Sequence, residues 1–308
     1  MSRCGGYLAQ MNLAASAAIP STWTDAHLHV WDSAVLAPPW LARAPQFVGR
    51  FDLARYHAEG GTRGGHVFVE ADVAHADRRC EAELFAEWGE ASGVPWASVA
   101  GIEPGLGIND EACLAQIATV GRVRGVTGAR RILHGADIPF STERFIVDLH
   151  RLGSHRLAFD FCIRWTDLAI LEGVLERVEG AQFVLDHLGN PPIRAGWASA
   201  ECVEWQRLLA RVARHAHIAV KWSAMFENAG RALTADEVRP WFEWCLTCFG
   251  PARMMWGSNW PVCFAPNSGA RLTQWIEACA TIGSKLGADE QAAIFGSTAR
   301  RVYRMTDR

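Results

Sequence analysis

The feature that most constrains this chain is an alternation of short apolar segments with longer stretches of helical periodicity. The short segments are rich in Val, Ile, Leu and Ala and have the length of buried strands. The intervening stretches carry apolar residues at helical spacing. The alternation predicts eight strands, at 24–30, 65–71, 96–102, 126–133, 157–163, 182–186, 217–222 and 253–257, with helices between them that include 78–91, 111–118, 143–152, 167–178, 200–215 and 235–249.

Eight β/α units without a break in composition predict a closed (β/α)8 TIM-type barrel, an α/β fold in a single domain. The length of 308 residues suits such a barrel. A doubly wound sheet is disfavoured because no G-x-G-x-x-G follows a predicted strand. We assign the barrel to residues 23–308 and predict that residues 1–22, rich in Ala, Ser and Gly, form a disordered extension. Polar residues interrupt the apolar run expected of a signal peptide there.

The composition narrows the range of partners. Half of the residues are hydrophobic, a fifth are charged, and the net charge is -3, so the chain offers no basic surface for nucleic acid. No segment reaches the roughly 20 apolar residues of a membrane-spanning helix. The nine cysteines are an odd number in a chain too long to need disulfide staples. We therefore expect a soluble, cytoplasmic protein that acts on a small molecule, and a homo-oligomer is compatible with the sequence.

Polar side chains stand at the ends of four of the eight predicted strands. In α/β barrels the carboxyl ends of the strands carry the active site. Groups that bind metal, move protons or polarise a carbonyl are therefore expected to meet at one mouth of the barrel. These groups are Asp25, His27 and His29 at the first strand, Glu70 and Asp72 at the second, Asp186 and His187 at the sixth, and Ser258 and Asn259 at the eighth.

The first strand places two histidines two residues apart. Because side chains alternate between the faces of a strand, His27 and His29 are expected to point into the barrel, with Asp25 beneath them. Two imidazoles on one face can chelate a divalent ion or hold a substrate oxygen. The spacing alone fits structural histidines equally well. Their position at the end of the first strand favours a functional role.

Four segments resemble one known family. They are Thr-Asp-Ala-His-Leu-His-Val-Trp-Asp (24–32), Val-Leu-Asp-His-Leu-Gly-Asn-Pro (184–191), Met-Trp-Gly-Ser-Asn-Trp-Pro-Val (255–262) and Ile-Phe-Gly-Ser-Thr-Ala-Arg-Arg-Val-Tyr (294–303). Their order is similar to that of the amidohydrolase superfamily, of the amidohydrolase-2 type. The sugar-lactonase branch is the nearest in pattern, with L-fucono-lactonases, L-rhamnono-lactonases and, further off, 2-pyrone-4,6-dicarboxylate lactonases. The resemblance implies a hydrolase that opens a lactone, a cyclic carboxylic ester, in carbohydrate metabolism.

The resemblance also implies roles for particular residues. In that family the matching histidines surround the lactone carbonyl, which gives this catalytic role to His27, His29 and His187. The segment Gly128-Ala129-Arg130 matches one whose arginine contacts substrate. We assign substrate binding also to His134, four residues further along, to Glu70 at the mouth, and to Trp260, whose indole could stack on a sugar ring.

The eighth strand departs from the family pattern. The family motif reads Gly-Ser-Asp-Trp-Pro, and its Asp deprotonates the attacking water, whereas this chain has Asn259. An amide cannot accept a proton from water at neutral pH. Three interpretations stay open: His187 or Glu70 is the base, the chain is a natural variant with different chemistry, or the Asn is an introduced substitution. If only the base is missing, Asn259→Asp should increase kcat.

The same departure bears on metal binding. With Asn in place of Asp, the strand ends offer a divalent ion neutral imidazoles and a weak amide oxygen. We therefore expect no required cofactor, while zinc at His27, His29 and His187 stays open. Water attack without a covalent intermediate is favoured because the chain has no G-x-S-x-G nucleophile motif. Two other functions stay open: a zinc-dependent decarboxylase or amide hydrolase of the same superfamily, and a catalytically silent barrel.

Overall fold

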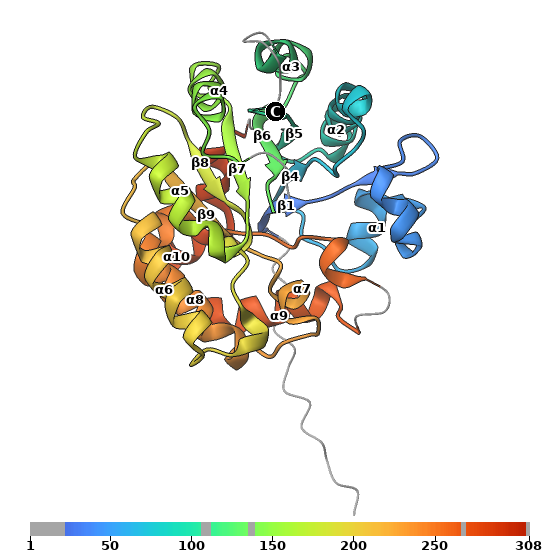
Figure 1. The fold of residues 1–308 in the computed structure, drawn as a ribbon. Coiled ribbons are helices and arrows are strands. Elements are labelled where there is room, and N and C mark those ends of the chain that lie inside the picture. Colours follow the sequence, from blue (N-terminus) through green and yellow to red (C-terminus); the bar gives the residue numbers. More distant parts are fainter. Residues whose placement is uncertain (1–21, 106–111, 135–138, 266–268, 306–308) are drawn as a thin grey trace, which may run out of the picture.

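The computed structural model describes residues 22–105, 112–134, 139–265 and 269–305. Eight parallel strands form one sheet in which each strand pairs with the next along the chain (Figure 1). Every one of them lies inside a range predicted from the sequence. The strands are β1 Thr24–Leu28, β4 Gly65–Val69, β5 Trp96–Gly101, β6 Val126–Ile132, β7 Ala158–Cys162, β8 Phe183–Leu185, β9 Ile218–Trp222 and β10 Met254–Trp256.

The first and last strands meet through the residues that follow them. The amide of His29 donates to the carbonyl of Trp260 at 2.8 Å, and the amide of Asn259 donates to the carbonyl of His27 at 2.8 Å. Leu28 and Trp260 form a parallel bridge. These contacts bring the barrel to closure and confirm the (β/α)8 prediction. They also place Asn259 next to the histidines of β1.

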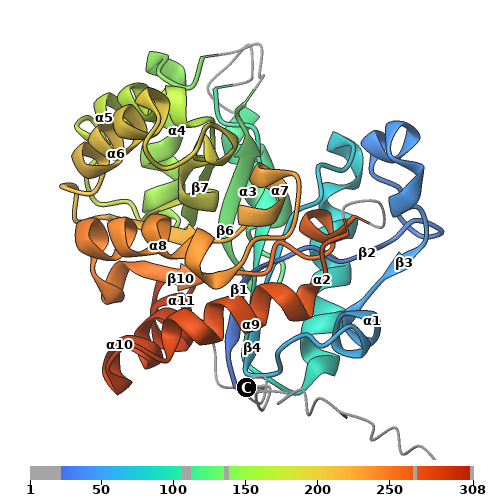
Figure 2. The same ribbon diagram turned by 90° about the horizontal axis from the view of Figure 1, so that it is seen from below.

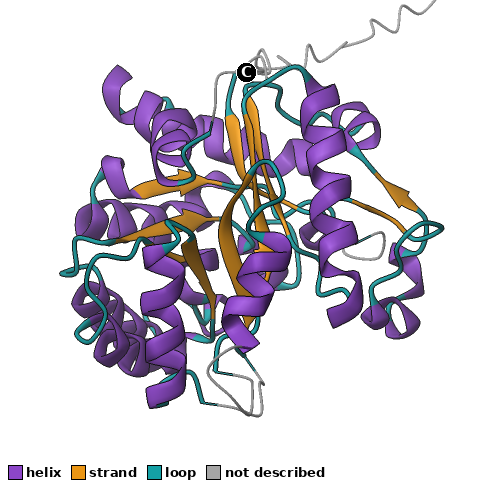
Figure 3. Cartoon of the chain, turned by 90° about the horizontal axis from the view of Figure 1, so that it is seen from above, coloured by secondary structure: helices purple, strands orange, loops and turns teal. Residues whose placement is uncertain are grey.

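Helices surround the strands on the outside (Figure 3). The six predicted helices are present. Among the described residues the structure also has five α-helices and a small hairpin of β2 and β3 that the sequence did not predict. In Figure 2 the orange and red elements α8 to α11 gather on one side of the barrel. The helices are α1 Leu53–Ala58, α2 Arg78–Ser92, α3 Ala112–Val120, α4 Glu143–Ser154, α5 Leu168–Leu175, α6 Ala200–Val212, α7 Met225–Ala229, α8 Ala235–Phe249, α9 Leu272–Gly283, α10 Ala288–Ala292 and α11 Thr298–Val302, and the hairpin strands are β2 Trp31–Asp32 and β3 Arg50–Phe51.

Two apolar layers lie on the two sides of the strands. The outer layer, between strands and helices, holds the large aromatic side chains. The inner layer is made of small residues such as Ala97, Ala158 and Ala219, together with Val302 and Tyr303 from the C-terminal segment. Small inner residues leave room for long polar side chains nearer the mouth, because inward positions alternate along each strand.

The predicted inward orientation of Asp25 is wrong. The register of β1 against β4 shifts between Asp25 and Leu28, so the strict alternation of faces is broken there. Ala26 packs in the inner layer. Asp25 instead accepts a hydrogen bond from the Tyr56 hydroxyl of α1 at 2.8 Å and one from the amide of Ser258 at 2.9 Å. This buried carboxyl therefore ties β1 to α1 and to the loop after β10.

Two predictions concern the ends and the environment of the chain. The predicted disordered extension falls, apart from Thr22, outside the described residues. Among the described residues, no helix is both long and apolar enough to cross a membrane.

Candidate active site

A cavity of about 340 Å³ opens at the carboxyl ends of the strands. Its size suits a small molecule, and it combines aromatic, imidazole, guanidinium and carboxylate side chains. Of the predicted site residues, His29, Arg130, His134, His187 and Asn259 line it directly. The full lining is His29, Trp31, Trp40, Ala71, Asp72, Arg130, Ile132, His134, Cys162, His187, Asn190, Glu227, Asn259 and Val262.

The histidines of the first strand form a hydrogen-bonded chain. His29 Nδ1 lies 3.0 Å from the carbonyl oxygen of Val69, which can only accept, so Nδ1 carries the proton. Burial, and then the charge of Arg130, lower the pKa of His29 to about 3, so the ring is neutral and its Nε2 accepts. His27 Nε2 lies 3.1 Å from that atom and therefore donates. Burial and Lys221 also lower the pKa of His27 well below its ordinary value.

Arg130 is held at the cavity by three groups behind it. Its Nε donates to Glu70 Oε1 at 2.6 Å and its Nη2 to the Glu70 carbonyl at 2.8 Å. Its Nη1 contacts Asp186 Oδ2 at 3.3 Å. Burial by itself would lower the pKa of Arg130, but the two carboxylates raise it, so the guanidinium stays charged. Glu70 also accepts from the amide of Asp72 at 2.7 Å. Glu70 thus lies behind Arg130 and orients its guanidinium, and it does not line the cavity itself.

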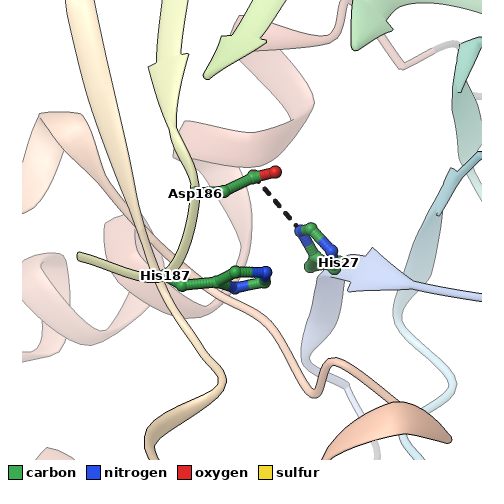
Figure 4. Close-up of side chains that lie close together, drawn as sticks. All are labelled: His27, Asp186 and His187. Atoms are coloured by element: carbon green, nitrogen blue, oxygen red, sulfur yellow. Dashed lines mark ion pairs between the residues drawn. The ribbon is translucent and has the colours of Figure 1, made fainter. Parts of the chain in front are cut away.

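Asp186 and His187 follow β8 and both point toward His27 (Figure 4). Asp186 Oδ1 lies 3.3 Å from His27 Nδ1, and the rings of His27 and His187 are 4.5 Å apart between centroids. His187 has a left-handed backbone, with φ of 56°, which lets neighbouring residues face the same mouth. Its Nδ1 lies 2.8 Å from the Ser223 hydroxyl. Burial lowers its pKa to about 3, so this imidazole is neutral as well.

Lys221 is a central residue that the sequence reasoning missed. It lies on β9, is fully buried, and its Nζ is 2.6 Å from Asp160 Oδ2, 3.1 Å from Asp186 Oδ1 and 3.2 Å from His27 Nδ1. Asp160 on β7 also accepts from the Tyr303 hydroxyl at 2.7 Å, and burial raises its pKa to about 6. The available signal was a charged residue within each of two otherwise apolar predicted strands.

The buried donors do not fit a divalent metal ion well. In the cavity region, the ligand atoms of His27, Asp186 and His187 lie within 4.8 Å of one another. This set differs from the predicted one in having Asp186 in place of His29. One oxygen of Asp186 contacts the ammonium of Lys221 and the other contacts the guanidinium of Arg130. A zinc ion there would lie beside two fixed positive charges. The lysine already supplies the cation that balances these carboxylates.

Asn259 meets a carboxylate that the sequence reasoning also missed. Its Nδ2 donates to Glu227 Oε2 at 2.7 Å, and both residues line the cavity. Glu227 lies on α7, the short helix after β9. Burial raises its pKa, while the hydrogen bond from Asn259 acts in the opposite direction. A Glu that follows a predicted strand at its carboxyl end was the signal that could have found it.

The prediction for Trp260 needs correction, because its side chain lies outside the cavity. The fully buried indole packs against Phe51 and Tyr56, and its Nε1 donates to Glu59 at 2.8 Å. The alternation of strand faces turns it toward α1, away from the mouth. Trp31 and Trp40 are the tryptophans that line the cavity.

The sequence matches the amidohydrolase family model over residues 24–305, and the chain belongs to this family. This confirms the resemblance read from the four motifs. The match includes every strand of the barrel and every polar group described above.

Individual relatives share less with the chain. An L-fucono-1,5-lactonase of Burkholderia ambifaria is 29% identical over 153 residues, which are 49% of this chain and 51% of that protein. An L-rhamnono-gamma-lactonase of Scheffersomyces stipitis is 26% identical over 184 residues, 54% of this chain and 52% of that protein. The chain thus spans about half the length of the curated relatives it matches.

A solved structure shares the whole fold. A Burkholderia multivorans amidohydrolase crystallised with bound zinc superposes with a TM-score of 0.76 at 24% identity, covering 92% of this chain and 99% of that chain. At this identity the likeness shows the fold.

Proposed function

We propose that this protein hydrolyses a lactone, and specifically a sugar lactone of the aldono-lactone class. The observation that carries the proposal is the convergence of a fixed guanidinium, Arg130, with the neutral imidazoles of His29 and His187 on one cavity. Arg130 and His187 can polarise an ester carbonyl and stabilise the negative charge that develops on its oxygen. The similarity to the L-fucono-1,5-lactonase and the L-rhamnono-gamma-lactonase supports a sugar lactone as the substrate class.

In this proposal Arg130 and His187 bind the carbonyl oxygen, because the single N–H of His29 already donates to the Val69 carbonyl. Lys221 donates to His27, and His27 donates to His29, so a positive charge stands at the inner end of the chain. Each donor polarises the next. The chain ends at the Val69 carbonyl, so it fixes the ring of His29 at the cavity wall. Water then attacks the carbonyl carbon, and no covalent intermediate with the protein is required. Trp40, which is only partly buried, offers an apolar face on which a sugar ring can stack, and the buried Trp31 packs against it.

The proposal includes turnover without a bound metal. It rests on Lys221 and Arg130, which neutralise the Asp186 carboxylate that a metal ion would need. A zinc-dependent decarboxylase or amide hydrolase is the second candidate. It is supported by the spacing of His27, Asp186 and His187 and by the zinc-bound relative of the same fold.

A substrate panel tests the proposal. Purified protein is added to aldono-lactones of five- and six-membered rings in a weakly buffered indicator solution, in which each hydrolysis releases a proton. Matched acyclic esters, amides and aromatic carboxylic acids serve as controls for the second candidate. Hydrolysis of sugar lactones in preference to the acyclic esters is the expected result. Turnover of amides or carboxylic acids alone, dependent on added zinc, would replace the proposal with the second candidate.

A further inference from the structure

We propose that Glu227 is the general base of this site and that Asn259 holds both this carboxylate and the attacking water. The inference rests on the proposed lactone hydrolysis and identifies the group that replaces the carboxylate absent from the eighth strand. It starts from one contact: the Asn259 amide nitrogen donates to Glu227 Oε2 at 2.7 Å at the wall of the cavity.

The carboxylate of this site belongs to α7 and not to the end of β10, and one hydrogen bond joins it to the residue at the end of β10. An Asn side chain has a donor and an acceptor, and its donor is used by Glu227. The acceptor, Asn259 Oδ1, is left to receive a hydrogen bond from water in the cavity. Because Glu227 and Asn259 both line that cavity, a water bound to the amide oxygen lies within reach of the carboxylate. Asn259 alone could bind this water but could not deprotonate it.

The other candidate bases are less suited. Glu70 is engaged by the guanidinium of Arg130 at 2.6 Å and by the amide of Asp72, behind the cavity wall. His187 lines the cavity, but burial lowers its pKa to about 3, so its imidazole is a weak proton acceptor at neutral pH. Glu227 differs from both, since it faces the cavity and burial raises its pKa toward the range in which a general base works.

The charged and titratable groups around Glu227 come from several elements. Arg130 on β6 lowers its pKa, and the thiols of Cys162 on β7 and Cys263 after β10 lie near enough to be affected by its charge. The guanidinium of Arg194 lies beside the end of α7, where a Cβ added at Gly230 would be 2.5 Å from its Nη2. Burial raises the pKa of both thiols, so at neutral pH they are uncharged and Arg130 is the main charge that acts on the carboxylate.

The proposed step balances as follows. An O–H bond of water breaks, its proton passes to Glu227, and the water oxygen forms a bond with the lactone carbonyl carbon. The oxyanion that results collapses and breaks the bond to the ring oxygen, which takes the proton from Glu227. The product is the open hydroxy acid, which ionises in solvent, and the carboxylate is regenerated. No other reactant is consumed.

Steady-state kinetics of Glu227→Gln on the best lactone test the proposal. Because proton transfer belongs to the transition state, kcat should fall by about 10²–10⁴-fold while KM changes little. Glu227→Asp, which keeps the carboxylate, should retain more activity than Glu227→Gln. The matched control is the exchanged pair Glu227→Gln with Asn259→Asp, which restores one carboxylate and one amide and should recover at least about tenfold of the lost kcat.

A kcat of Glu227→Gln close to that of the parent protein, in a variant whose urea unfolding is also unchanged, would overturn the inference. An infrared pH titration gives a second readout that does not need turnover. The difference between the infrared spectra of the parent protein and Glu227→Gln should contain one carboxyl band that titrates above the ordinary pKa of glutamate. The absence of this band would also overturn the inference. A parent protein that hydrolyses no lactone would instead contradict the proposed function, and the titration would still decide the state of Glu227.

Discussion

Lys221 inside the barrel contacts two carboxylates and an imidazole, whereas Glu227 at the mouth accepts a hydrogen bond from the neutral amide of Asn259. The two residues belong to adjacent parts of the chain, one on β9 and the other on the helix that follows it. Their surroundings nevertheless favour opposite behaviour. Lys221 is fixed in an inner network of opposite charges. Glu227 is buried as well, but within the described residues its side chain forms no ion pair, and its hydrogen-bond donor is the neutral Asn259.

The difference separates groups that set the electrostatics of the site from a group that can exchange a proton. Burial alone would raise the pKa of Asp186, but in the inner network Lys221 holds it well below its ordinary value. Such a carboxylate remains ionised throughout turnover. Burial raises the pKa of Glu227 instead, which is the direction expected of a catalytic base. The inner network should therefore control stability, and the mouth should control kcat.

The largest effect on stability is expected from Lys221→Met, which removes the inner cation and keeps the length of the side chain. Breaking a buried ion pair costs about 3–5 kcal/mol, because the partner carboxylates Asp160 and Asp186 lose their counterion. Urea denaturation of the variant and the parent protein measures the change. Glu227→Gln is the control at the mouth and should change the free energy of unfolding by less than about 1 kcal/mol. Equal losses of unfolding free energy in the two variants would contradict the distinction between the inner network and the mouth.

The buried histidines should make the free energy of unfolding decrease at acidic pH. His29, His66 and His187 each have a pKa lowered to about 3, chiefly by burial, so the unfolded chain binds more protons between pH 3 and 6.5. Their contribution to stability is complete above pH 6.5 and is lost as the pH falls toward 3, by about 1.4 kcal/mol per pH unit for each histidine. Urea denaturation at a series of pH values should show this decline.

His66 provides a control that lies away from the site. Within the described part of the chain neither of its ring nitrogens has a hydrogen-bond partner, and the ring packs against Tyr56 and Phe68. His66→Phe should lower by one the number of protons that the chain binds when it unfolds between pH 3 and 6.5. The slope of the free energy of unfolding against pH should therefore fall by about 1.4 kcal/mol per pH unit. An unchanged slope would show that His66 is not a neutral, buried group.

The smallest effect on turnover is expected from Asn259→Asp. The sequence alone suggested that this change restores a missing base and increases kcat. In the structure the new carboxyl would contact Glu227, and two carboxyls at that distance share a proton because one of them cannot readily ionise. We expect kcat at neutral pH to change by less than about tenfold, with the acid limb of the pH profile moved upward. A rise of several hundredfold would favour the missing-base interpretation.

The strand-end argument predicted much of the site, and its failures have local physical causes. It placed His29, Arg130, His187 and Asn259 at one mouth because the carboxyl ends of parallel strands converge. It did not predict the role of Lys221, because a single charged residue in an apolar strand does not indicate which buried groups it contacts on the other strands. It misplaced Asp25 because a shift of register is not encoded in a simple alternation.

The residues beyond the strand ends depend on loop geometry. Glu227 reaches the cavity because Ala224, which lies between β9 and α7, adopts a left-handed backbone and redirects the chain. Trp260 turns outward even though it adjoins Asn259, because neighbouring side chains point to opposite sides. Trp31 and Trp40 reach the cavity through the small hairpin and the loop within it, which the periodicity of a barrel does not predict.

The central claim is that the cavity hydrolyses sugar lactones with the charges of its own residues. Initial rates on the best aldono-lactone, measured before and after exhaustive dialysis against a chelator, test it most directly, with metal content determined on the same samples. The account predicts a kcat/KM of the order of 10⁴ M⁻¹s⁻¹ or more that is unchanged by removal of metal. Loss of activity on dialysis with recovery on adding zinc, or no hydrolysis of any sugar lactone in either state, would contradict it.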